Sequence, residues 1–411
     1  MRICYVPHLR FPEFTEEWKK CKVSDLLDFY STNSLSWEQL EYDTNTMMNL
    51  HYGLIHVGLP TMVDLAKDKL PNIKKENMLK NFELCKEGDV AFADASEDTN
   101  EVAKTIEYYN LAGKNIVCGL HTIHGRDNKN KTVVGFKGYA FSSAAFHNQI
   151  RRIAQGTKIY SISTKNFSEC YIGLPSKPEQ TKIATLLRLI DEHISTQNKI
   201  IEDLKKLKSA IIEKIFNEPH SNKIRLGDIG SYIRGLTYSN DDVVEQDGVF
   251  VMRSNNIING SSLDYQHNIV SVNKQILTEQ QLQDGDIIIC MANGSSSLVG
   301  KSSFYDGNCS IPITVGAFCG IYRSKEPIVK WLFQTSKYRR YIGNSLQGGN
   351  GAIANLNGDD ILRMSFSIPD APAKDNGVKL LTSLDTLLES NLLLYGLYTK
   401  QKKYLLRQMF I

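Results

Sequence analysis

The second half of the amino-acid sequence resembles the first half, and this duplication limits what the chain can fold into. Pro175 has a counterpart in Pro369, a shift of 194 residues. Repeats that build solenoids have periods of about 20–50 residues, so a shift this long indicates duplication of a whole domain. The same shift relates further pairs of identical residues: Asp191 and Asp385, and Lys208 and Lys402.

Earlier segments of the two halves also correspond, with small gaps between them. Residues 87–90 (Glu-Gly-Asp-Val) resemble residues 284–287 (Asp-Gly-Asp-Ile), and a Gln-Gly pair follows a basic segment in each half. A chain of 411 residues is long enough for roughly two to three domains of ordinary size. The sequence therefore predicts a globule, a long helix, a second globule and a second long helix.

The segment that ends each half has the periodicity of a coiled-coil helix. Between residues 183 and 215, positions spaced alternately by four and three residues are apolar, except for Gln197 and Lys208. The second segment repeats this stripe from Leu381 to Met409. Because a strict stripe of this kind is too narrow for a helix that lies on a globular core, it favours packing of the two helices against each other. The alternative is that each helix lies on its own globule.

Antiparallel packing of these helices would place the globules at opposite ends of a rod, because one whole globule lies between the helices in the chain. At 1.5 Å per residue, the stripe in the first helix would give a rod of about 48 Å. The predicted domains are residues 1–176 for the first globule, 177–217 for the first helix, 218–371 for the second globule and 372–411 for the second helix.

Each globule is predicted to be a mixed α/β (α+β) domain with several short strands. Short β-branched and apolar runs bounded by Gly, Asn and Ser indicate the strands, and amphipathic basic segments indicate the helices. We expect strands at 89–93, 116–123, 171–174, 249–253, 286–292, 315–322 and 364–368, and helices near 139–154 and at 327–342.

Polar loops and basic segments supply the candidate DNA-binding residues. Asn pairs with adenine, Arg pairs with guanine and Ser donates or accepts, while basic side chains contact phosphates. The same residue types also suit plain turns, and a basic segment also suits a solvated helix face. The candidates are Ser96, His121, Arg151, Arg152, Lys158, Arg253, Ser254, Asn255, Asn256, Asn293, Ser295, Lys301, Arg339, Arg340 and Asn350.

Composition narrows the class of protein without identifying it. The net charge of +3 is too small to indicate nucleic-acid binding by itself, so any basic surface must be local. The eight cysteines have no CxxC spacing, which predicts free thiols in a reducing cytoplasm. The sequence has no apolar stretch of about 18 residues that would span a membrane. We therefore expect a cytoplasmic protein without a membrane partner.

Three motifs that would indicate an enzyme or a metal site do not fit well. Residues 294–302 resemble a phosphate-binding loop, but five residues separate the glycines where four are needed. His121 and His124 lie on or near a strand, with no carboxylate pattern that would complete a zinc site. Asp94 has two further acidic residues near it, but the sequence shows no lysine in the matching place that the metal site of a nuclease would need. We expect no catalytic residue and no bound metal.

At this point the residues resemble those of a known family, the specificity subunits of type I restriction–modification enzymes. Residues 175–191, with Pro178-Glu179-Gln180 and Lys182-Ile183-Ala184, are similar to the opening of the family's central conserved helix. The start of the chain (7–18) and its end (408–410) are also similar to that family, and residues 94–98 with 119–122 resemble a variant of its first target-recognition domain. The second copy departs from the pattern, because Ala373-Lys374 stand in place of the Glu-Gln pair.

The resemblance implies a function. Each globule would be a target-recognition domain for one half of a split, asymmetric site in double-stranded DNA, and the helix pair would set the gap. The helices would also dock two modification methyltransferase subunits and, through them, two restriction motor-nuclease subunits. The chain itself would be non-catalytic and hold no cofactor, while its partners would use S-adenosylmethionine, ATP and magnesium. The alternatives are a coiled-coil scaffold that does not bind DNA, and a stand-alone DNA-acting enzyme.

Overall fold

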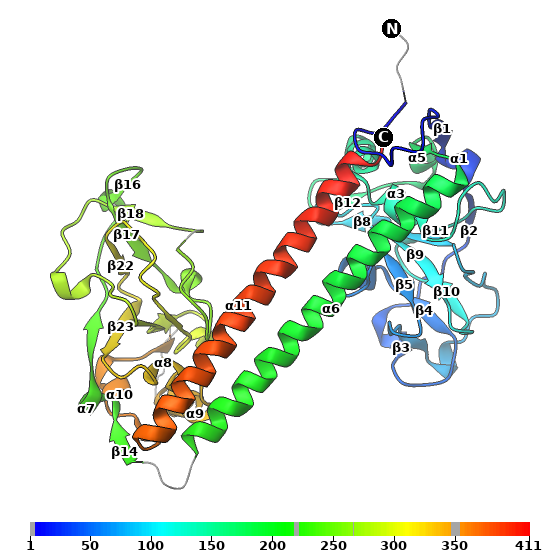
Figure 1. The fold of residues 1–411 in the computed structure, drawn as a ribbon. Coiled ribbons are helices and arrows are strands. Elements are labelled where there is room, and N and C mark those ends of the chain that lie inside the picture. Colours follow the sequence, from blue (N-terminus) through cyan, green and yellow to red (C-terminus); the bar gives the residue numbers. More distant parts are fainter. Residues whose placement is uncertain (1–4, 218–221, 266, 347–353) are drawn as a thin grey trace. The chain divides into compact units, whose positions relative to one another are not determined.

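The structure is a computed structural model that describes all residues except 1–4, 218–221, 266 and 347–353. The chain divides into two compact units (Figure 1). Unit 1 comprises residues 1–198 and 393–411, and unit 2 comprises residues 199–392. Within the described ranges, no helix is both long and apolar enough to cross a membrane.

Unit 1 is built on two sheets that share a buried core. The five-stranded sheet has the order β2-β11-β7-β9-β5, and the four-stranded sheet has the order β10-β4-β6-β3. The first sheet contains β2 Asp28–Tyr30, β5 Met62–Asp64, β7 Val90–Ala93, β9 Thr105–Asn110 and β11 Thr122–Arg126. The second contains β3 Leu40–Glu41, β4 Met48–Leu50, β6 Asn72–Ile73 and β10 Ile116–Cys118.

Two ribbons, five short α-helices and two 3₁₀ helices (Trp37–Gln39 and Lys75–Asn77) complete the described part of the globule of unit 1. The ribbons pair β1 Lys19–Lys22 with β13 Tyr171–Leu174, and β8 Ala95–Ser96 with β12 Tyr160–Ser161. The helices are α1 Val23–Leu26, α2 Tyr52–His56, α3 Phe136–Phe141, α4 Ala144–Ile153 and α5 Thr164–Ser168.

Unit 2 has the same plan. One sheet has the order β15-β23-β19-β21 and the other β16-β18-β17-β22. The strands are β15 Gly230–Arg234, β23 Cys319–Ser324, β19 Ile287–Cys290, β21 Ser302–Phe304, β16 Val243–Val244, β18 Val270–Val272, β17 Val249–Met252 and β22 Ile313–Val315. The ribbons pair β14 Asn222–Arg225 with β25 Ser365–Ile368, and β20 Ala292–Asn293 with β24 Ala354–Asn355. The short helices are α7 Leu226–Ile229, α8 Val329–Leu332, α9 Ser336–Leu346 and α10 Gly358–Leu362.

The strand pairing confirms the duplication predicted from the sequence. In unit 1 a parallel pair in the smaller sheet joins β4 and β10, and in unit 2 the equivalent pair joins β17 and β22. The β7–β11 pairing in unit 1 has the same register as the β19–β23 pairing in unit 2. Val90 lies opposite Gly125 in the first, as Ile287 lies opposite Tyr322 in the second. The predicted mixed α/β fold with two globules is therefore confirmed.

One buried ion pair recurs in both units at equivalent positions. In unit 1, Arg126 donates through Nε and Nη2 to the two carboxylate oxygens of Asp89, each at 2.8 Å. In unit 2, Arg323 donates to Asp286 in the same way, at 2.8 and 2.7 Å. A fork of two parallel bonds fixes geometry as well as charge. Burial would raise the pKa of Asp89, but hydrogen bonds from His124 and Arg126 outweigh it and lower that pKa.

Three predicted strands, at 116–123, 286–292 and 315–322, and two predicted helices are each divided in two, and 286–292 is divided between β19 and β20. The predicted strand 315–322 ends at Val315 and resumes at Cys319 in a different sheet, because Cys319 N donates to Gly316 O in a tight turn. The predicted strand 116–123 divides in the same way between β10 and β11. The helices divide where Ser143 and Thr335 accept bonds from the backbone three residues on, as helix-capping side chains do.

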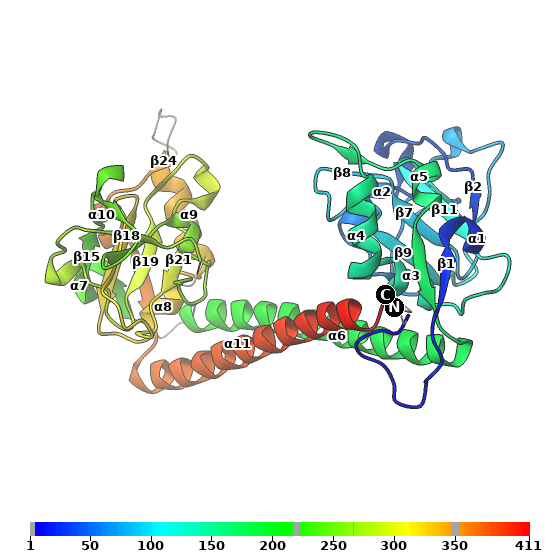
Figure 2. The same ribbon diagram turned by 90° about the horizontal axis from the view of Figure 1, so that it is seen from above.

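The long helices α6 (Lys177–Phe216) and α11 (Ala371–Gln408) run antiparallel within each unit. In unit 1, which Figure 2 shows from above, the start of α6 packs on the end of α11, where Asp191 pairs with Lys402 at 2.6 Å. In unit 2, the end of α6 packs on the start of α11, where Lys208 pairs with Asp385 at 2.6 Å. The apolar stripe is the side of both helices that is buried or partly buried, as the periodicity predicts.

The two long helices begin differently, as their sequences indicate. In α6, Glu179 is buried and accepts two bonds from Arg10 and one from Trp18. Gln180 ties the same turn to the globule by accepting from Val133 N. The second helix lacks this Glu-Gln pair but begins regularly at Ala371. The division into the four predicted domains stays a prediction, as does the spacing between the globules.

Candidate nucleic-acid interface

Three of the predicted DNA-binding residues of unit 2 come together in one cluster, which we call the unit 2 loop cluster (Ser254, Asn293 and Lys301). The amide of Asn293 donates to Ser254 Oγ at 3.5 Å, and the Lys301 ammonium donates to Ser254 O at 3.3 Å. All three side chains are partly exposed. The cluster therefore presents a hydroxyl, an amide and a cation, and Ser254 is 39 and 47 residues away in the chain from Asn293 and Lys301.

Further candidates lie beside this cluster or on the neighbouring helix α9. Arg253 and Asn255 flank Ser254 and are exposed, and Ser295 is exposed in the loop that follows β20. Arg339 bonds to Asn259 at 2.8 Å, and Asn259 also accepts from Ser302 N, next to Lys301. Arg340 is exposed on α9, and Asn350 lies outside the described residues.

Among the candidates that the structure describes, Asn256 is the one that it corrects. Its side chain is fully buried. It accepts from Arg253 N and donates to the carbonyl oxygens of Asp264 and His267. A buried amide with these bonds holds the loop together and has no face left for a base. The turn chemistry that the sequence also allowed is the right interpretation here.

Unit 1 brings its own candidates together through a chain of polar contacts. Ser96 Oγ accepts from Asp98 N, and Asp98 in turn accepts from Asn100. Arg151 then donates to Asn100 at 2.7 Å from helix α4. Arg152 on the same helix and Lys158 in the following loop are exposed. The structure thus places Ser96 and Arg151 along one polar loop, and a serine beside an arginine is a combination that suits base reading next to a phosphate contact.

His121 lies on the turn that joins β10 to β11, with a left-handed backbone at φ 54°. Its ring pairs with Asp94 at 3.2 Å and packs edge-on against Tyr52 at 5.2 Å between ring centroids. Burial raises the pKa of Asp94, and the charge of His121 opposes that shift. The ring is half exposed on the side chain, so it remains available to a ligand.

The position of His121 reveals a residue that the sequence interpretation missed. In unit 2 the equivalent turn joins β22 to β23 and carries Phe318 in the place of His121. His121 O accepts from Asp94 N, and Phe318 O accepts from Met291 N at the matching place. Phe318 is 66% exposed, which is unusual for a phenylalanine. Aligning the two halves on their Gly-Asp pairs, at 88–89 and 285–286, would have found it from the sequence.

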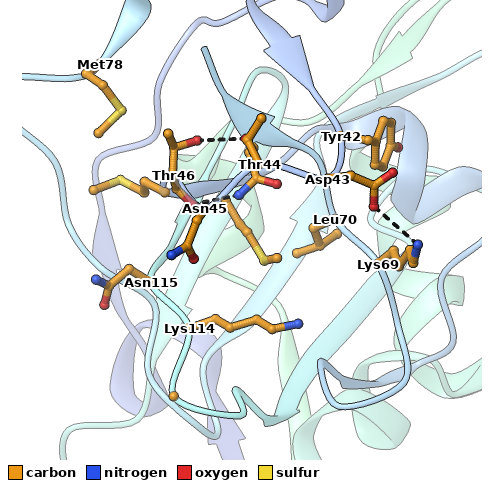
Figure 3. Close-up of a pocket in the computed structure, with 14 residues that line it drawn as sticks. Tyr42, Asp43, Thr44, Asn45, Thr46, Lys69, Leu70, Met78, Lys114 and Asn115 are labelled. Carbon is orange, nitrogen blue, oxygen red and sulfur yellow. Dashed lines mark hydrogen bonds and ion pairs between the residues drawn. The ribbon is translucent and has the colours of Figure 1, made fainter. Parts of the chain in front are cut away.

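A pocket of about 690 Å³ with a mixed polar and apolar lining opens on the smaller sheet of unit 1 (Figure 3). Figure 3 shows Asn45, Asn115 and Lys114 around it, with Lys69 paired to Asp43. Sequence interpretation named none of these residues, because they come from short loops without a basic run. Asn and Lys side chains that line a recess are also able to contact nucleic acid, so this pocket is a separate candidate site, and none of the predicted DNA-binding residues lines it.

Three buried side chains of unit 1 could hold a metal ion, although the sequence predicted none. One ligand atom each from Cys85, Cys118 and His124 lies within 4.8 Å of the others. The cysteines are 33 residues apart in the chain and have no CxxC spacing, so no sequence motif signals them. Because all three side chains are buried, they belong to the core of the unit and not to its surface.

Comparison with known proteins identifies the family that these features resemble. Residues 68–206 match the Type I restriction modification DNA specificity domain. The chain is 33% identical over 173 residues to the EcoKI specificity subunit of Escherichia coli (strain K12), covering 39% of this chain and 34% of that protein. It is 32% identical over 172 residues to the StySPI specificity subunit of Salmonella potsdam, with the same coverage. The chain thus spans about a third of the length of these relatives.

Solved structures match a much larger share of the fold. The crystal structure of a type I restriction–modification S subunit from M. genitalium superposes with a TM-score of 0.60 at 16% identity, covering 99% of each chain. A chain from a structure on complex assembly and conformational transition of the type I R-M system gives a TM-score of 0.51 at 13% identity, covering 95% of this chain and 96% of that one. At these identities the likeness establishes the fold.

Proposed function

From its confirmed resemblance to the specificity subunits of type I restriction–modification enzymes, we propose that this chain selects the double-stranded DNA sequence on which its partner subunits act. Each globule would read one half of a split, asymmetric site. The observation that carries this proposal is that both duplicated units present polar side chains at equivalent positions. Ser96 ends strand β8 as Asn293 ends strand β20, and these strands form corresponding ribbons.

The two clusters differ in chemistry although they share a position, which suits an asymmetric site. Unit 1 presents a hydroxyl and an imidazole, while unit 2 presents a hydroxyl, an amide, a lysine and an exposed aromatic ring. Amide and hydroxyl groups pair differently with base edges, and apolar groups contact the thymine methyl. Basic residues on α4 and α9 would hold the backbone phosphates. The two half-sites would therefore differ in sequence.

We further propose that the long helices dock the methyltransferase and motor-nuclease partners. Helix α11 exposes Leu380, Leu387 and Leu394 at seven-residue intervals, with 38–48% of each residue exposed. Leu393 and Leu397 are exposed by 66% and 52% on the adjoining face. Exposed apolar patches on soluble proteins commonly mark interaction sites, and an apolar helix face is a common recognition element.

On this proposal the chain is not itself an enzyme and acts in the cytoplasm. S-adenosylmethionine, ATP and magnesium would be bound by the two methyltransferase and two motor-nuclease subunits. The near match to a phosphate-binding loop supports no other assignment, because residues 302–304 continue into strand β21. A phosphate-binding loop needs a helix N-terminus at that place.

Methylome sequencing tests the proposal in cells that carry a partner methyltransferase. Expression of this chain should produce methylation at one bipartite motif, and its absence should remove that methylation. Exchange of residues 220–370 for those of another specificity subunit should change one half-site only. A control substitution outside both clusters and outside α11, Leu277→Ala at a residue that is 62% exposed, should leave the motif unchanged. Identical methylation with and without the chain would contradict the proposal.

A further inference from the structure

The core of unit 1 contains a group of polar side chains that its fold does not need. Cys85, Cys118 and His124 are exposed by only 5%, 1% and 0%, respectively. Cys118 ends strand β10 and His124 lies in β11, so the group joins the two sheets of the unit. The two cysteine sulfur atoms are 3.6 Å apart and do not form a disulfide.

One nitrogen of the buried histidine has no hydrogen-bond partner among the described residues. His124 Nε2 bonds to the Asp89 carboxylate at 2.7 Å, while Nδ1 is buried and unpaired. A buried polar atom without a partner costs about 1–3 kcal/mol. Unpaired buried atoms of this kind in a native fold call for an explanation such as a missing ion.

The duplicated unit shows what this core looks like without polar groups. The positions equivalent to Cys85, Cys118 and His124 are Leu282, Val315 and Ile321. Register and backbone bonding establish the match: Cys85 N donates to Ile116 O as Leu282 N donates to Ile313 O. The three aliphatic side chains belong to one buried hydrophobic cluster. The fold is thus compatible with aliphatic side chains at these three positions. Unit 1 has two cysteines and a histidine there instead, which are residue types that bind metal ions.

We propose that Cys85, Cys118 and His124 bind one zinc ion in the core of unit 1. Two thiolates on a tetrahedral zinc, with Zn–S bonds of about 2.3 Å, lie about 3.7 Å apart. The observed separation of 3.6 Å between the two sulfur atoms fits this distance. The Tyr108 hydroxyl also lies near the group, 3.7 Å from Cys118 Sγ.

The surroundings of the site supply the other features that zinc sites share. A histidine ligand generally donates its second ring N–H to a carboxylate, which fixes the ring, and Asp89 does this for His124. Asp89 is held in turn by Arg126. Two thiolates balance the charge of a divalent cation, so the buried complex would be neutral, which avoids a large desolvation cost. Binding releases the two thiol protons and involves no change of oxidation state.

The site would be structural, since it is closed to solvent. Zinc would join β10 of the smaller sheet to β11 of the larger one, and would stabilise unit 1 without touching unit 2. Because such a site is not accessible in the folded chain, the metal would enter during folding. The zinc site is independent of the proposed function.

Metal analysis of the full chain tests the proposal. The protein is expressed in medium with zinc, purified under reducing conditions and unfolded before its metal is measured with a chromogenic chelator. The matched control replaces the three ligands with the residues of unit 2, as Cys85→Leu, Cys118→Val and His124→Ile. We expect about one zinc per chain in the natural protein and at least tenfold less in this variant, with both proteins folded.

A second measurement keeps the test valid if the variant does not fold. The natural chain is refolded with cobalt(II) alone, and thiolate-to-cobalt charge-transfer absorption of a tetrahedral site is expected. Absence of both zinc and this absorption in the folded natural chain would overturn the proposal. A disulfide between Cys85 and Cys118, or binding of copper(I) in place of zinc, would also overturn it.

Discussion

The recurring ion pair has different neighbours in the two units, and this difference is visible at single residues. Asp89 in unit 1 keeps a second partner in His124, at 2.7 Å, when its arginine is removed. Asp286 in unit 2 is 1% exposed, and among the described residues Arg323 is the only cation that pairs with it. The same substitution should therefore have unequal effects in the two units.

We expect Arg323→Met to destabilise unit 2 by about 3–5 kcal/mol, because it leaves a buried carboxylate without a cation. Arg126→Met should cost unit 1 less, since His124 still bonds to Asp89. Hydrogen exchange of the β19 and β7 amides reports each unit separately. Arg340→Met, on an exposed side chain, is the control and should change neither. Equal losses in the two units would show that His124 does not hold Asp89.

The exposed ring of Phe318 leads to a second prediction about a single residue. Phe318→Ala should weaken DNA binding by about 1–2 kcal/mol, because truncated aromatic anchors in interfaces cost this much. Thermal stability should not change, since the ring is 66% exposed. Leu277→Ala, similarly exposed at 62% on the loop before Thr278, is the matched control and should retain affinity. Binding is measured as Kd at one fixed salt concentration.

A sequence pattern shows which residue types are present more readily than it shows which side chains are exposed to solvent. The polar loops correctly indicated the surface around Ser254 and Asn293, but they could not distinguish the buried Asn256 from its exposed neighbours. Its role depends on carbonyl groups 8 and 11 residues away, which no local pattern reveals. Phe318 was missed for the opposite reason, because an apolar residue between two strands predicts burial.

At the scale of elements, the long helices were predictable because their signal is long and occurs twice. A heptad stripe over more than four heptads leaves little room for another structure. The short elements were not predictable in the same way. Single side chains such as Ser143 and Thr335 divide a continuous pattern by capping a new helix, and a tight turn at Gly316 divides a strand.

The reciprocal ion pairs between the long helices lead to a prediction about elements. Lys208 and Asp385 are 8% and 9% exposed, whereas Lys402 and Asp191 are 21% and 17% exposed. Asp385→Leu alone should destabilise unit 2 by about 3–5 kcal/mol, since it leaves a buried ammonium unpaired. Adding Lys208→Met should recover only part of this loss, because Asp385 also pairs with Lys330 at 3.2 Å and accepts from Trp331 Nε1 at 3.1 Å, and both of these partners remain.

The equivalent pair in unit 1 provides the control for this measurement. Asp191→Leu should cost less than Asp385→Leu, because water reaches the Lys402 ammonium that it leaves behind. Ser383→Ala, on the exposed face of α11, should have no effect. Denaturant unfolding followed by hydrogen exchange in each unit gives the four values. A double variant as unstable as Asp385→Leu would contradict the interpretation of the pair as replaceable.

For the whole molecule, duplication explains why one chain could read an asymmetric site. The two globules share strand order and registers, yet the residues at equivalent positions differ, as Ser96 and Asn293 do. The helix contacts are reciprocal, since Asp191 meets Lys402 and Lys208 meets Asp385. If the helix pair sets the gap between half-sites, the gap must follow the helix length and not the globules.

Insertion of seven residues between residues 198 and 199 and seven between residues 392 and 393 tests this dependence. Seven residues preserve the heptad phase, so the apolar stripes should still face each other. Each helix would lengthen by about 10 Å, and the preferred gap should grow by about three base pairs at ~3.4 Å each. Methylome sequencing should then show the same two half-sites at the longer spacing.

Two further variants separate spacing from stability. Insertion of seven residues into one helix only should abolish methylation, because Lys208 and Asp385 can no longer meet while Asp191 and Lys402 do. Insertion of four residues into both helices shifts the apolar stripes out of a strict heptad phase. This variant should lower the stability of the helix pair, whereas the paired seven-residue insertion should change the methylated motif. An unchanged gap after the paired seven-residue insertion would mean that the globules or the partner subunits set the spacing. In that case the helix pair would serve only to dock the partners.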